Sequence, residues 1–226
     1  TCCFGEADDQ LMFAGTTHNA VLAYDRRAPS SNTPSFTLPC DTHVNSIALS
    51  ADKSLLFSGD SAGDLKTWDL RSQKCLYSLK NGDLGKPISH IVVDRGRSGG
   101  RYIAANSYDN VLRVYCRDSF LPSSRTQQDS QFTLVRSFTG HKNTNWPIKS
   151  AFFTGKPLID DIGNGNSGPS STPRDSRYFI ATGSSDSCVY VYDMDAGKRY
   201  QRLEGHRDRV YAVAFHPTEP VMATAS

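Results

Sequence analysis

One short motif recurs along the chain, and this repeat limits the possible folds more than any other feature of the sequence. Each copy is an apolar run that ends in small or hydroxyl residues. The five copies are Met12–Thr16, Leu56–Asp60, Ile103–Ser107, Ile180–Asp186 and Val221–Ser226. An internal repeat of this kind predicts a fold assembled from copies of one structural unit.

Segments with alternating apolar residues surround each copy. Four copies continue through a tight turn into such a segment, at Val21–Asp25, Leu65–Asp69, Val111–Tyr115 and Val189–Asp193. Others precede the motif at Val44–Leu49, Ile88–Val93, Ile148–Phe153 and Val210–Phe215, and follow it at Cys75–Leu79, Leu134–Phe138 and Tyr200–Leu203. Period-2 alternation with β-branched and aromatic residues is typical of half-buried strands, and no segment has a helical period with caps. The sequence therefore predicts an all-β protein made of four-stranded antiparallel units.

Recurring dipeptides mark the ends of these units. They are Gly140-His141 and Gly205-His206 before the first strand, and Trp68-Asp69, Tyr24-Asp25 and Tyr192-Asp193 at the end of the third. With these dipeptides the sequence resembles the WD-repeat family over nearly its whole length. The resemblance implies a single β-propeller domain. Its predicted blades cover approximately residues 1–40, 41–83, 84–139, 140–204 and 205–226.

Three of these blades are expected to be complete and two partial. Residues 1–10 are polar, so the first blade lacks a convincing inner strand, and the last blade stops at Ser226 before its third strand. Closed propellers have about four to eight blades. An open arc exposes unpaired strand edges, which promote aggregation. We therefore expect the natural protein to continue on both sides and this chain alone to be poorly soluble.

The spacing of the third strands predicts two insertions. Tyr24 and Trp68 are 44 residues apart and Trp68 and Tyr115 are 47 apart, but Tyr115 and Tyr192 are 77 apart. The family period is roughly 40–45 residues. Two polar stretches account for the excess, 117–131 and 155–176, and their composition buries too little apolar area to order itself. We expect surface loops there; a docking or modification segment is the alternative.

The resemblance also implies a structural role for several polar residues. In WD-repeat blades a His, a strand Ser or Thr, a turn Asp and the Trp form a hydrogen-bonded tetrad, since a buried imidazole needs partners for both nitrogens. The matching positions are His141, Ser184 and Asp186, with Tyr192 in place of Trp, and the pattern recurs at His206 and Ser226. The Trp68 blade has Cys40, Asp60 and Ala62 at these positions and is predicted to form no tetrad.

The same His, Ser and Asp could be described as a catalytic triad. We set this interpretation aside because the Ser and His positions recur at Ser226 and His206, and an active site would not be copied into each blade. No phosphate loop or metal-ligand spacing is present. The sequence therefore predicts a protein that is not an enzyme and needs no cofactor.

Composition narrows the classes of partner. The chain has 226 residues and a formal net charge of +2, too balanced to indicate nucleic acid or a membrane surface from bulk charge. No apolar run approaches the roughly 20 residues of a membrane span. The six cysteines lack disulfide-framework or zinc spacing, which favours reduced thiols and a cytoplasmic or nuclear location.

The resemblance places partner contacts on the loops around the channel mouth. Two positions per blade tend to contribute, one near the start of the inner strand and one before the turn Asp. The first set is Asn45, Ser89, Lys149 and Tyr211, and the second is Thr17, Ser61, Tyr108 and Ser185. For any single residue, a solvated loop position is the alternative.

The loop after His141 is longer than the loop after His206 and contains Trp146. This side chain is either an exposed anchor or a plug under its loop, and we favour the plug because an exposed Trp is costly without a partner. Arg207 and Arg209, with Lys142 and Lys149, could form a basic patch for an acidic or phosphorylated segment.

The leading hypothesis is a protein-interaction scaffold, a subunit or substrate receptor of a hetero-complex that presents peptide-binding loops. The alternative is a nucleic-acid or chromatin reader that uses the basic loops, which the near-neutral charge disfavours. An enzyme that uses the propeller channel ranks lowest, because no pocket constellation stands out.

Overall fold

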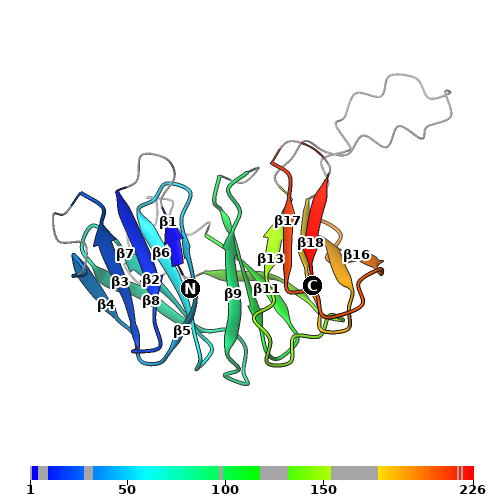
Figure 1. Ribbon diagram of the computed structural model, residues 1–226, viewed down its shortest axis with the longest axis horizontal. Helices are drawn as coiled ribbons and strands as arrows, with labels where there is room; N and C mark the ends of the chain where they lie inside the picture. Colours follow the sequence, from blue (N-terminus) through cyan, green and yellow to red (C-terminus); the bar gives the residue numbers. More distant parts are fainter. Residues whose placement is uncertain are drawn as a thin grey trace.

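A computed structural model describes residues 2–4, 10–27, 33–96, 99–117, 132–153, 178–217, 219 and 221–226. Every regular element in this part of the chain is a β-strand, as Figure 1 shows, which confirms the predicted all-β class. None of the described residues belongs to a helix long and apolar enough to cross a membrane. The predicted insertions at 117–131 and 155–176 lie, apart from Arg117, outside the described residues.

The strands form four four-stranded sheets and one two-stranded sheet. The first contains β1 (Cys2–Phe4), β2 (Leu11–Gly15), β3 (Ala20–Asp25) and β4 (Phe36–Pro39). The second contains β5 (Val44–Leu49), β6 (Leu55–Asp60), β7 (Asp64–Asp69) and β8 (Lys74–Lys80). The third contains β9 (Ile88–Val93), β10 (Tyr102–Ser107), β11 (Leu112–Cys116) and β12 (Thr133–Phe138). The fourth contains β13 (Ser150–Phe152), β14 (Phe179–Thr182), β15 (Val189–Asp193) and β16 (Lys198–Leu203), and the last contains β17 (Ala212–Phe215) and β18 (Met222–Ala225).

The first sheet corrects one expectation from the sequence. Residues 1–10 appeared too polar for an inner strand, but β1 pairs antiparallel with β2, with Cys3 opposite Phe13. The first sheet therefore has four strands, like the three that follow. A strand of three residues is too short to show an alternating pattern, and pairing with an already formed hairpin stabilises it.

The second, third and fourth sheets repeat the same irregularity. Their third and fourth strands shift register between Thr67 and Trp68, between Val114 and Tyr115, and between Val191 and Tyr192. A bulge increases local twist and bends the strand. Because it recurs at the same position of the motif, these sheets are structurally equivalent copies of one unit.

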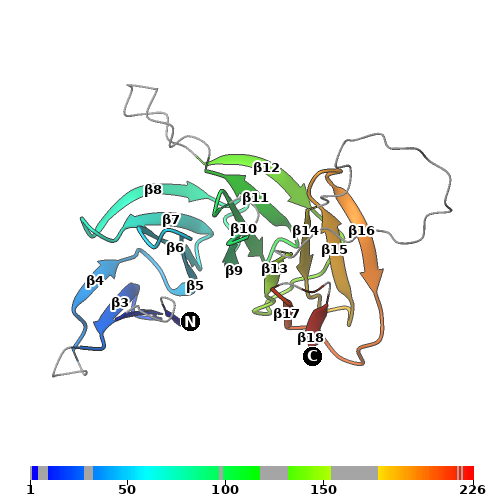
Figure 2. The ribbon, with the colours of Figure 1, turned by 90° about the horizontal axis from the view of Figure 1, so that it is seen from above.

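The sheets lie side by side in an arc, with the β1–β4 sheet and the β17–β18 pair at its two ends (Figure 2). Apolar side chains from neighbouring sheets fill the space between them. Phe13 and Leu38 pack with Ile47 and Trp68 between the first two sheets, for example. Three further buried clusters occupy the other junctions. Burial of apolar side chains between sheets, rather than within any one of them, therefore holds the arc together.

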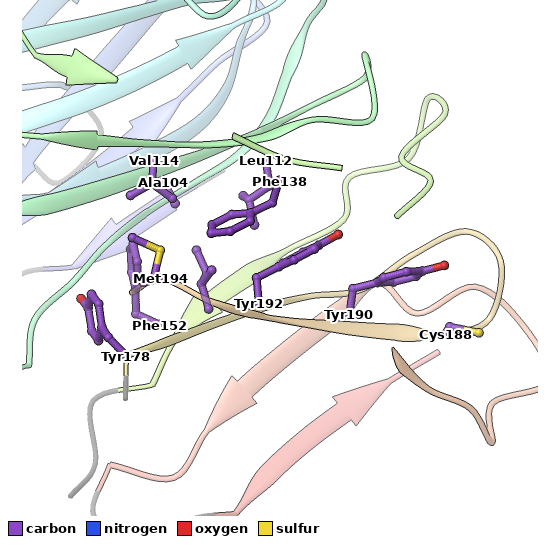
Figure 3. Close-up of a cluster of buried hydrophobic side chains, with 11 residues drawn as sticks. Ala104, Leu112, Val114, Phe138, Phe152, Tyr178, Cys188, Tyr190, Tyr192 and Met194 are labelled. Atoms are coloured by element: carbon purple, nitrogen blue, oxygen red, sulfur yellow. The ribbon is translucent and has the colours of Figure 1, made fainter. Parts of the chain in front are cut away.

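The cluster between the third and fourth sheets is rich in aromatic residues (Figure 3). Phe138 of β12 stacks on Tyr192 of β15 with ring centroids 4.7 Å apart. Tyr192 is also roughly parallel to Tyr190, two residues earlier on the same strand. Aromatic pairs in offset-stacked geometry add to the free energy of burial. This junction therefore gains stability from ring stacking as well as from its large buried apolar area.

Neighbouring sheets approach most closely at one position of the second strand. Gly59 and Asn106 occupy it, opposite Leu65 and Leu112 respectively, and Gly183 follows β14 at the same place. A Cβ atom at Gly183 would lie 2.1 Å from the carbonyl oxygen of Val210 in the next blade. The second and fourth blades therefore need glycine here, and the third blade carries an amide side chain instead.

Candidate protein interface

The two sets of residues predicted to contact a partner lie on the same rim of the arc, along the lower side of Figure 1. Backbone hydrogen bonds join them. Ser61 N donates to His43 O, Tyr108 N to Pro87 O and Ser185 N to Lys142 O, at 2.8–3.0 Å. In these three blades the turn after the second strand is thereby fastened to the loop that enters the first strand. The rim is a row of paired loops on a rigid frame, an arrangement suited to recognition.

Three predicted residues meet at one place on this rim. Trp146 packs edge to face against Tyr211, with ring centroids 5.9 Å apart. The guanidinium carbon of Arg209 lies 4.4 Å from the centroid of the Trp146 ring, a cation–π contact. All three side chains are half-buried. We call them the Trp146 cluster.

The burial of Trp146 is intermediate between an exposed anchor and a plug under its loop. Its ring is covered on one side by neighbouring blade residues and remains partly open to solvent. Lys149, on the same loop, is exposed, and its backbone N–H donates to the Tyr211 carbonyl at 2.8 Å. The loop of the fourth blade and that of the last blade are therefore bonded together at the cluster.

The remaining predicted partner residues are spread along the rim. Thr17 and Arg207 are exposed, and Tyr108 and Ser185 are half-buried. Asn45 and Ser61 are half-buried and contact each other, with Ser61 Oγ 3.4 Å from Asn45 Oδ1. The Asn45 amide also donates to the carbonyl of Ile88 at 3.1 Å, so Asn45 helps to join two sheets as well as facing the rim.

Ser89 differs from the other predicted partner residues because it is only 6% exposed. Its hydroxyl donates to the Asn106 carbonyl at 3.1 Å and accepts from Asn143 Nδ2 at 2.7 Å. Since its hydrogen-bonding capacity is used inside the protein, we leave Ser89 out of the interface. Its hydrogen bonds support the rim loops from the interior of the protein.

Ser89 belongs to a buried polar network that the sequence did not reveal. The centre of the network is Asn106, whose Nδ2 donates to Thr182 Oγ1 at 2.8 Å and to Ser150 Oγ at 3.2 Å. Its Oδ1 accepts from Asn143 Nδ2 at 3.1 Å and lies 3.0 Å from His141 Nε2. Asn106 therefore connects the third blade to three separate segments of the fourth.

His141 links this network to the aromatic cluster. Its Nδ1 lies 3.2 Å from the Tyr192 hydroxyl, which also donates to the Thr139 carbonyl at 3.0 Å. Because Asn106 Oδ1 can only accept, Nε2 carries the proton of the neutral imidazole, and Nδ1 is an acceptor that competes with the Thr139 carbonyl for the single Tyr192 proton. Burial lowers the pKa of His141 to about 4, against a smaller opposing effect of Asp109 and Asp186, so the ring is neutral at physiological pH.

The network also fixes the loop that carries Trp146. Asn143 is fully buried, and its backbone N–H donates to Asn110 Oδ1 in the neighbouring turn at 2.6 Å. Its side-chain Oδ1 has no hydrogen-bond partner among the described residues. Three residues before Trp146, the chain is thus anchored in the interior of the molecule.

The residues proposed for the tetrad are only partly brought together. His141 contacts Tyr192, whereas Ser184 Oγ accepts from the Lys142 backbone N–H at 2.9 Å and Asp186 Oδ2 accepts from the Tyr190 hydroxyl at 2.7 Å. In the last blade His206 Nδ1 lies 3.0 Å from Ser226 Oγ, and its Nε2 lies 2.7 Å from Thr224 Oγ1.

In the Trp68 blade the indole N–H finds a different partner. It donates to Ser58 Oγ at 2.8 Å, and both groups are buried. Asp60 meanwhile accepts two backbone N–H groups of the following turn. A buried indole donor is therefore satisfied without a Gly-His histidine.

One signal in the sequence could have pointed to the network. Asn106 stands where the other full repeats have Gly15, Gly59 and Gly183, so it is the one position at which a polar side chain replaces a required glycine. No signal in the sequence singled out Leu84, which is 71% exposed in the loop between β8 and β9 and adds apolar surface to the rim.

Chemistry beyond binding has little support in this region. The two nitrogens of His141 are occupied by Tyr192 and Asn106, and the imidazole is 1% exposed. Within the described ranges no three His, Cys, Asp or Glu side chains are grouped so that they could hold a metal ion. Cys116 and Cys188 are buried, Cys40 is half-buried and Cys75 is exposed, and the thiols of Cys40, Cys75 and Cys188 are free.

Comparisons with known proteins agree with this architecture. The family described as "WD domain, G-beta repeat" matches residues 32–69 and 197–226. The LEC14B homolog of Prunus armeniaca is 24% identical over 97% of this chain and 47% of its own length. The DDB1- and CUL4-associated factor 11 homolog of Caenorhabditis elegans is 26% identical over 96% of this chain and 39% of its own.

A shorter match is closer in sequence. The human U5 small nuclear ribonucleoprotein 40 kDa protein is 45% identical over 47 residues, which are 21% of this chain and 13% of that protein. The chain spans about half the length, or less, of the first two relatives and the Caenorhabditis elegans protein.

Proposed function

Since the chain belongs to the WD-repeat family, we propose that it is a non-catalytic scaffold that binds other proteins through the loops of one propeller rim. Proteins of this family act generally as interaction scaffolds. The finer proposal is that this one is a subunit or substrate receptor of a multiprotein complex in the cytoplasm or nucleus. The names of two relatives support it, because one is a DDB1- and CUL4-associated factor homolog and the other is a small nuclear ribonucleoprotein protein.

The observation that carries the proposal is the Trp146 cluster. A Trp, a Tyr and an Arg from two blades meet on a solvent-facing rim, half-buried and in mutual contact. These three residue types are enriched among the few residues that supply most of the binding free energy at protein interfaces, because they combine a large apolar surface with hydrogen-bonding groups. Their loops are fixed by backbone bonds and by the buried network, so a partner meets a preformed surface.

The same surface gives less support to a nucleic-acid reader. Arg209 has Asp208 beside it, with an N···O distance of 3.7 Å, and Glu204 lies in the same connection. Nucleic acids bind mainly through neutralisation of phosphates by many Lys and Arg side chains. Mixed charges in this loop fit recognition of a protein better.

Affinity purification of the full-length protein tests the proposal. Partners captured by the unaltered protein should be lost when Trp146→Ala and Lys149→Ala are combined, because anchor and neighbouring charge are both removed. Lys198→Ala on the exposed start of β16 is the control and should retain them. Retention of all partners by the double variant, with its thermal unfolding unchanged, would refute the assignment of this rim.

Two further readouts refine the test. Partners should survive nuclease treatment and remain bound at about 0.3 M salt, where phosphate-dominated complexes are strongly weakened. Blotting the captured material for DDB1 asks whether the association named for the Caenorhabditis elegans relative extends to this protein. Absence of DDB1 from the captured material would exclude a DDB1-associated role, and the scaffold function would then be exercised in another complex.

A further inference from the structure

We propose that the Trp146 cluster recognises a partner segment in which an Asp or Glu carboxylate lies next to an apolar side chain. This inference rests on the proposed scaffold function and names the chemistry of its partner. It follows from the geometry of Arg209, from the charged residues on the neighbouring loops and from the aromatic surface beside it.

Arg209 is held in a geometry suited to a carboxylate. Its guanidinium lies over the face of the Trp146 ring at 4.4 Å. An Arg that stacks on an aromatic ring uses the face of its planar group and keeps its N–H donors at the edge for a bidentate acceptor. Because the stack already restricts the side chain, less conformational entropy is lost when an anion binds.

The neighbouring Asp208 occupies part of this site in the free protein. Its Oδ1 is 3.7 Å from Arg209 Nη1, and its side chain is 72% exposed, against 41% for Arg209. Asp208 Oδ1 accepts from the Arg209 backbone N–H at 2.7 Å, but at 3.7 Å it is an ion-pair neighbour of the guanidinium and accepts no hydrogen bond from it. Exposed ion pairs of this kind are weak. A partner carboxylate can therefore replace Asp208 with better geometry.

Further basic residues lie on the two loops that meet at the Trp146 cluster. Lys142, Lys149 and Arg207 are all exposed on the same two loops. The Lys142 carbonyl accepts from Ser185 N and the Lys149 N–H donates to Tyr211 O, so the backbone of both lysines is fixed. Near Arg209, Asp208 and Glu204 are the acidic residues on these connections, which leaves an excess of basic side chains and complements an acidic segment.

An apolar contact lies directly beside the charges. The Trp146 and Tyr211 rings are perpendicular, with an interplanar angle of 77°, and both remain partly open to solvent. An apolar side chain adjacent to the carboxylate can bury itself against these rings. The combination of a fixed Arg and a fixed aromatic corner selects for two neighbouring side chains rather than for diffuse negative charge.

Selection from a displayed library of random 16-residue peptides on the full-length protein tests the inference without knowledge of the natural partner. The enriched peptides should contain Asp or Glu next to Leu, Ile, Phe or another apolar residue. An enriched peptide should bind at least about tenfold more weakly to Arg209→Gln, as expected for loss of a hydrogen bond to a charged group. Replacement of its own Glu by Gln should have a similar effect.

Matched variants separate the bidentate hydrogen-bonding geometry of the Arg209 guanidinium from its positive charge. Arg209→Lys keeps the charge and should still bind more weakly than the unaltered protein, while Asp208→Asn should bind more tightly because the internal competitor is gone. Lys198→Gln, an exposed charge on β16, should leave affinity unchanged. Thermal unfolding of each variant shows that the fold is intact.

Several outcomes would overturn the inference. They are a library that yields no peptide or no acidic enrichment, equal binding by Arg209→Gln, a 20-nucleotide RNA or DNA that binds more tightly than any peptide, and binding of only the phosphoserine version of a peptide. Neutral peptides that are lost with Trp146→Ala would overturn the acidic partner and leave the proposed function standing. Peptides indifferent to both Trp146→Ala and Arg209→Gln would count against both.

Discussion

Asn106 is the single residue on which most of the buried polar contacts between the third and fourth blades depend. Its side chain contacts His141, Asn143, Ser150 and Thr182, all of them less than 5% exposed. Removing one partner of a buried hydrogen bond leaves the other unsatisfied and costs about 1–3 kcal/mol. Several such groups are affected here at once.

Asn106→Gly places in the third blade the residue that the other blades have at this position. We expect it to lower the free energy of unfolding by at least about 2 kcal/mol, because the polar groups of the fourth blade lose their partner. Urea denaturation measures the effect. Asn145→Gly is the matched control, since Asn145 is exposed and has a φ of 59°, which glycine adopts freely. Equal stability of Asn106→Gly and the unaltered protein would contradict a stabilising role for the network.

His141 makes the stability of this junction depend on pH. Burial lowers its pKa from 6.5 to about 4, so the unfolded chain binds more protons than the folded one between these values. Stability is therefore fully present above about pH 6.5 and is lost as the pH falls toward 4, by about 3 kcal/mol at most. His90, whose pKa is also lowered to about 4 by burial and by Lys149, adds a second contribution in the same window.

Urea midpoints measured from pH 7 to pH 4.5 check this dependence. In His141→Gln the loss of stability over this range should be about half that of the unaltered protein, because His90 still contributes. The variant is also expected to be less stable at pH 7, where the His141 hydrogen bonds are intact. A pH slope identical to that of the unaltered protein would show that His141 is not buried and neutral as described.

Individual strands were largely predictable, whereas contacts between sheets were not. Alternating apolar residues at Leu65–Asp69 and Val189–Asp193 predicted β7 and β15 because a half-buried strand has a period of two. The three residues of β1 are too few to show such a period. The partner of His141 was missed because repeat alignment compares positions within blades, and Asn106 belongs to the neighbouring one.

The strand position occupied by Gly59 and Gly183 offers a test of how the sheets pack. A Cβ at Gly183 would meet the Val210 carbonyl oxygen at 2.1 Å, a backbone atom that cannot rotate away. A Cβ at Gly59 would meet Ile88 Cγ2 at 2.6 Å and Ile91 Cδ1 at 2.8 Å, which are side-chain atoms and can shift further than a backbone carbonyl. Neither glycine has a positive φ, so alanine adds a clash and no backbone strain.

Gly183→Ala should therefore destabilise the protein by about 2–3 kcal/mol and Gly59→Ala by about 1 kcal/mol. The order of the two effects matters more than their size, because both substitutions are chemically the same and differ only in what they meet. Thermal unfolding of the two variants measures it. A larger cost at Gly59 would mean that the second and third sheets are packed more rigidly than the fourth and fifth.

In the whole molecule each sheet is stabilised by its neighbours, so position in the arc should determine local stability. The second, third and fourth sheets pack against a buried cluster on both faces. Among the described residues, the β17–β18 pair packs against a buried cluster on one face only, and its contributions to that cluster include the half-buried Phe215 and Met222. In arrays of repeated units, stability is approximately the sum of unit and nearest-neighbour terms. The third sheet also shares the polar network, which joins it to the fourth.

Hydrogen exchange of the 226-residue chain, followed by mass spectrometry, should show this gradient. We expect the slowest exchange in β6, β7, β10 and β11, which are the central strands of the second and third sheets. The fastest exchange is expected in β17 and β18, because the hydrogen bonds of this pair open without disrupting a second packed face. Asn106→Gly should accelerate exchange at the junction, in β10 and β14, more than in β6 and β7. Uniform protection from β2 to β18 would show instead that the arc unfolds as one cooperative unit, with the network contributing nothing specific to the junction it spans.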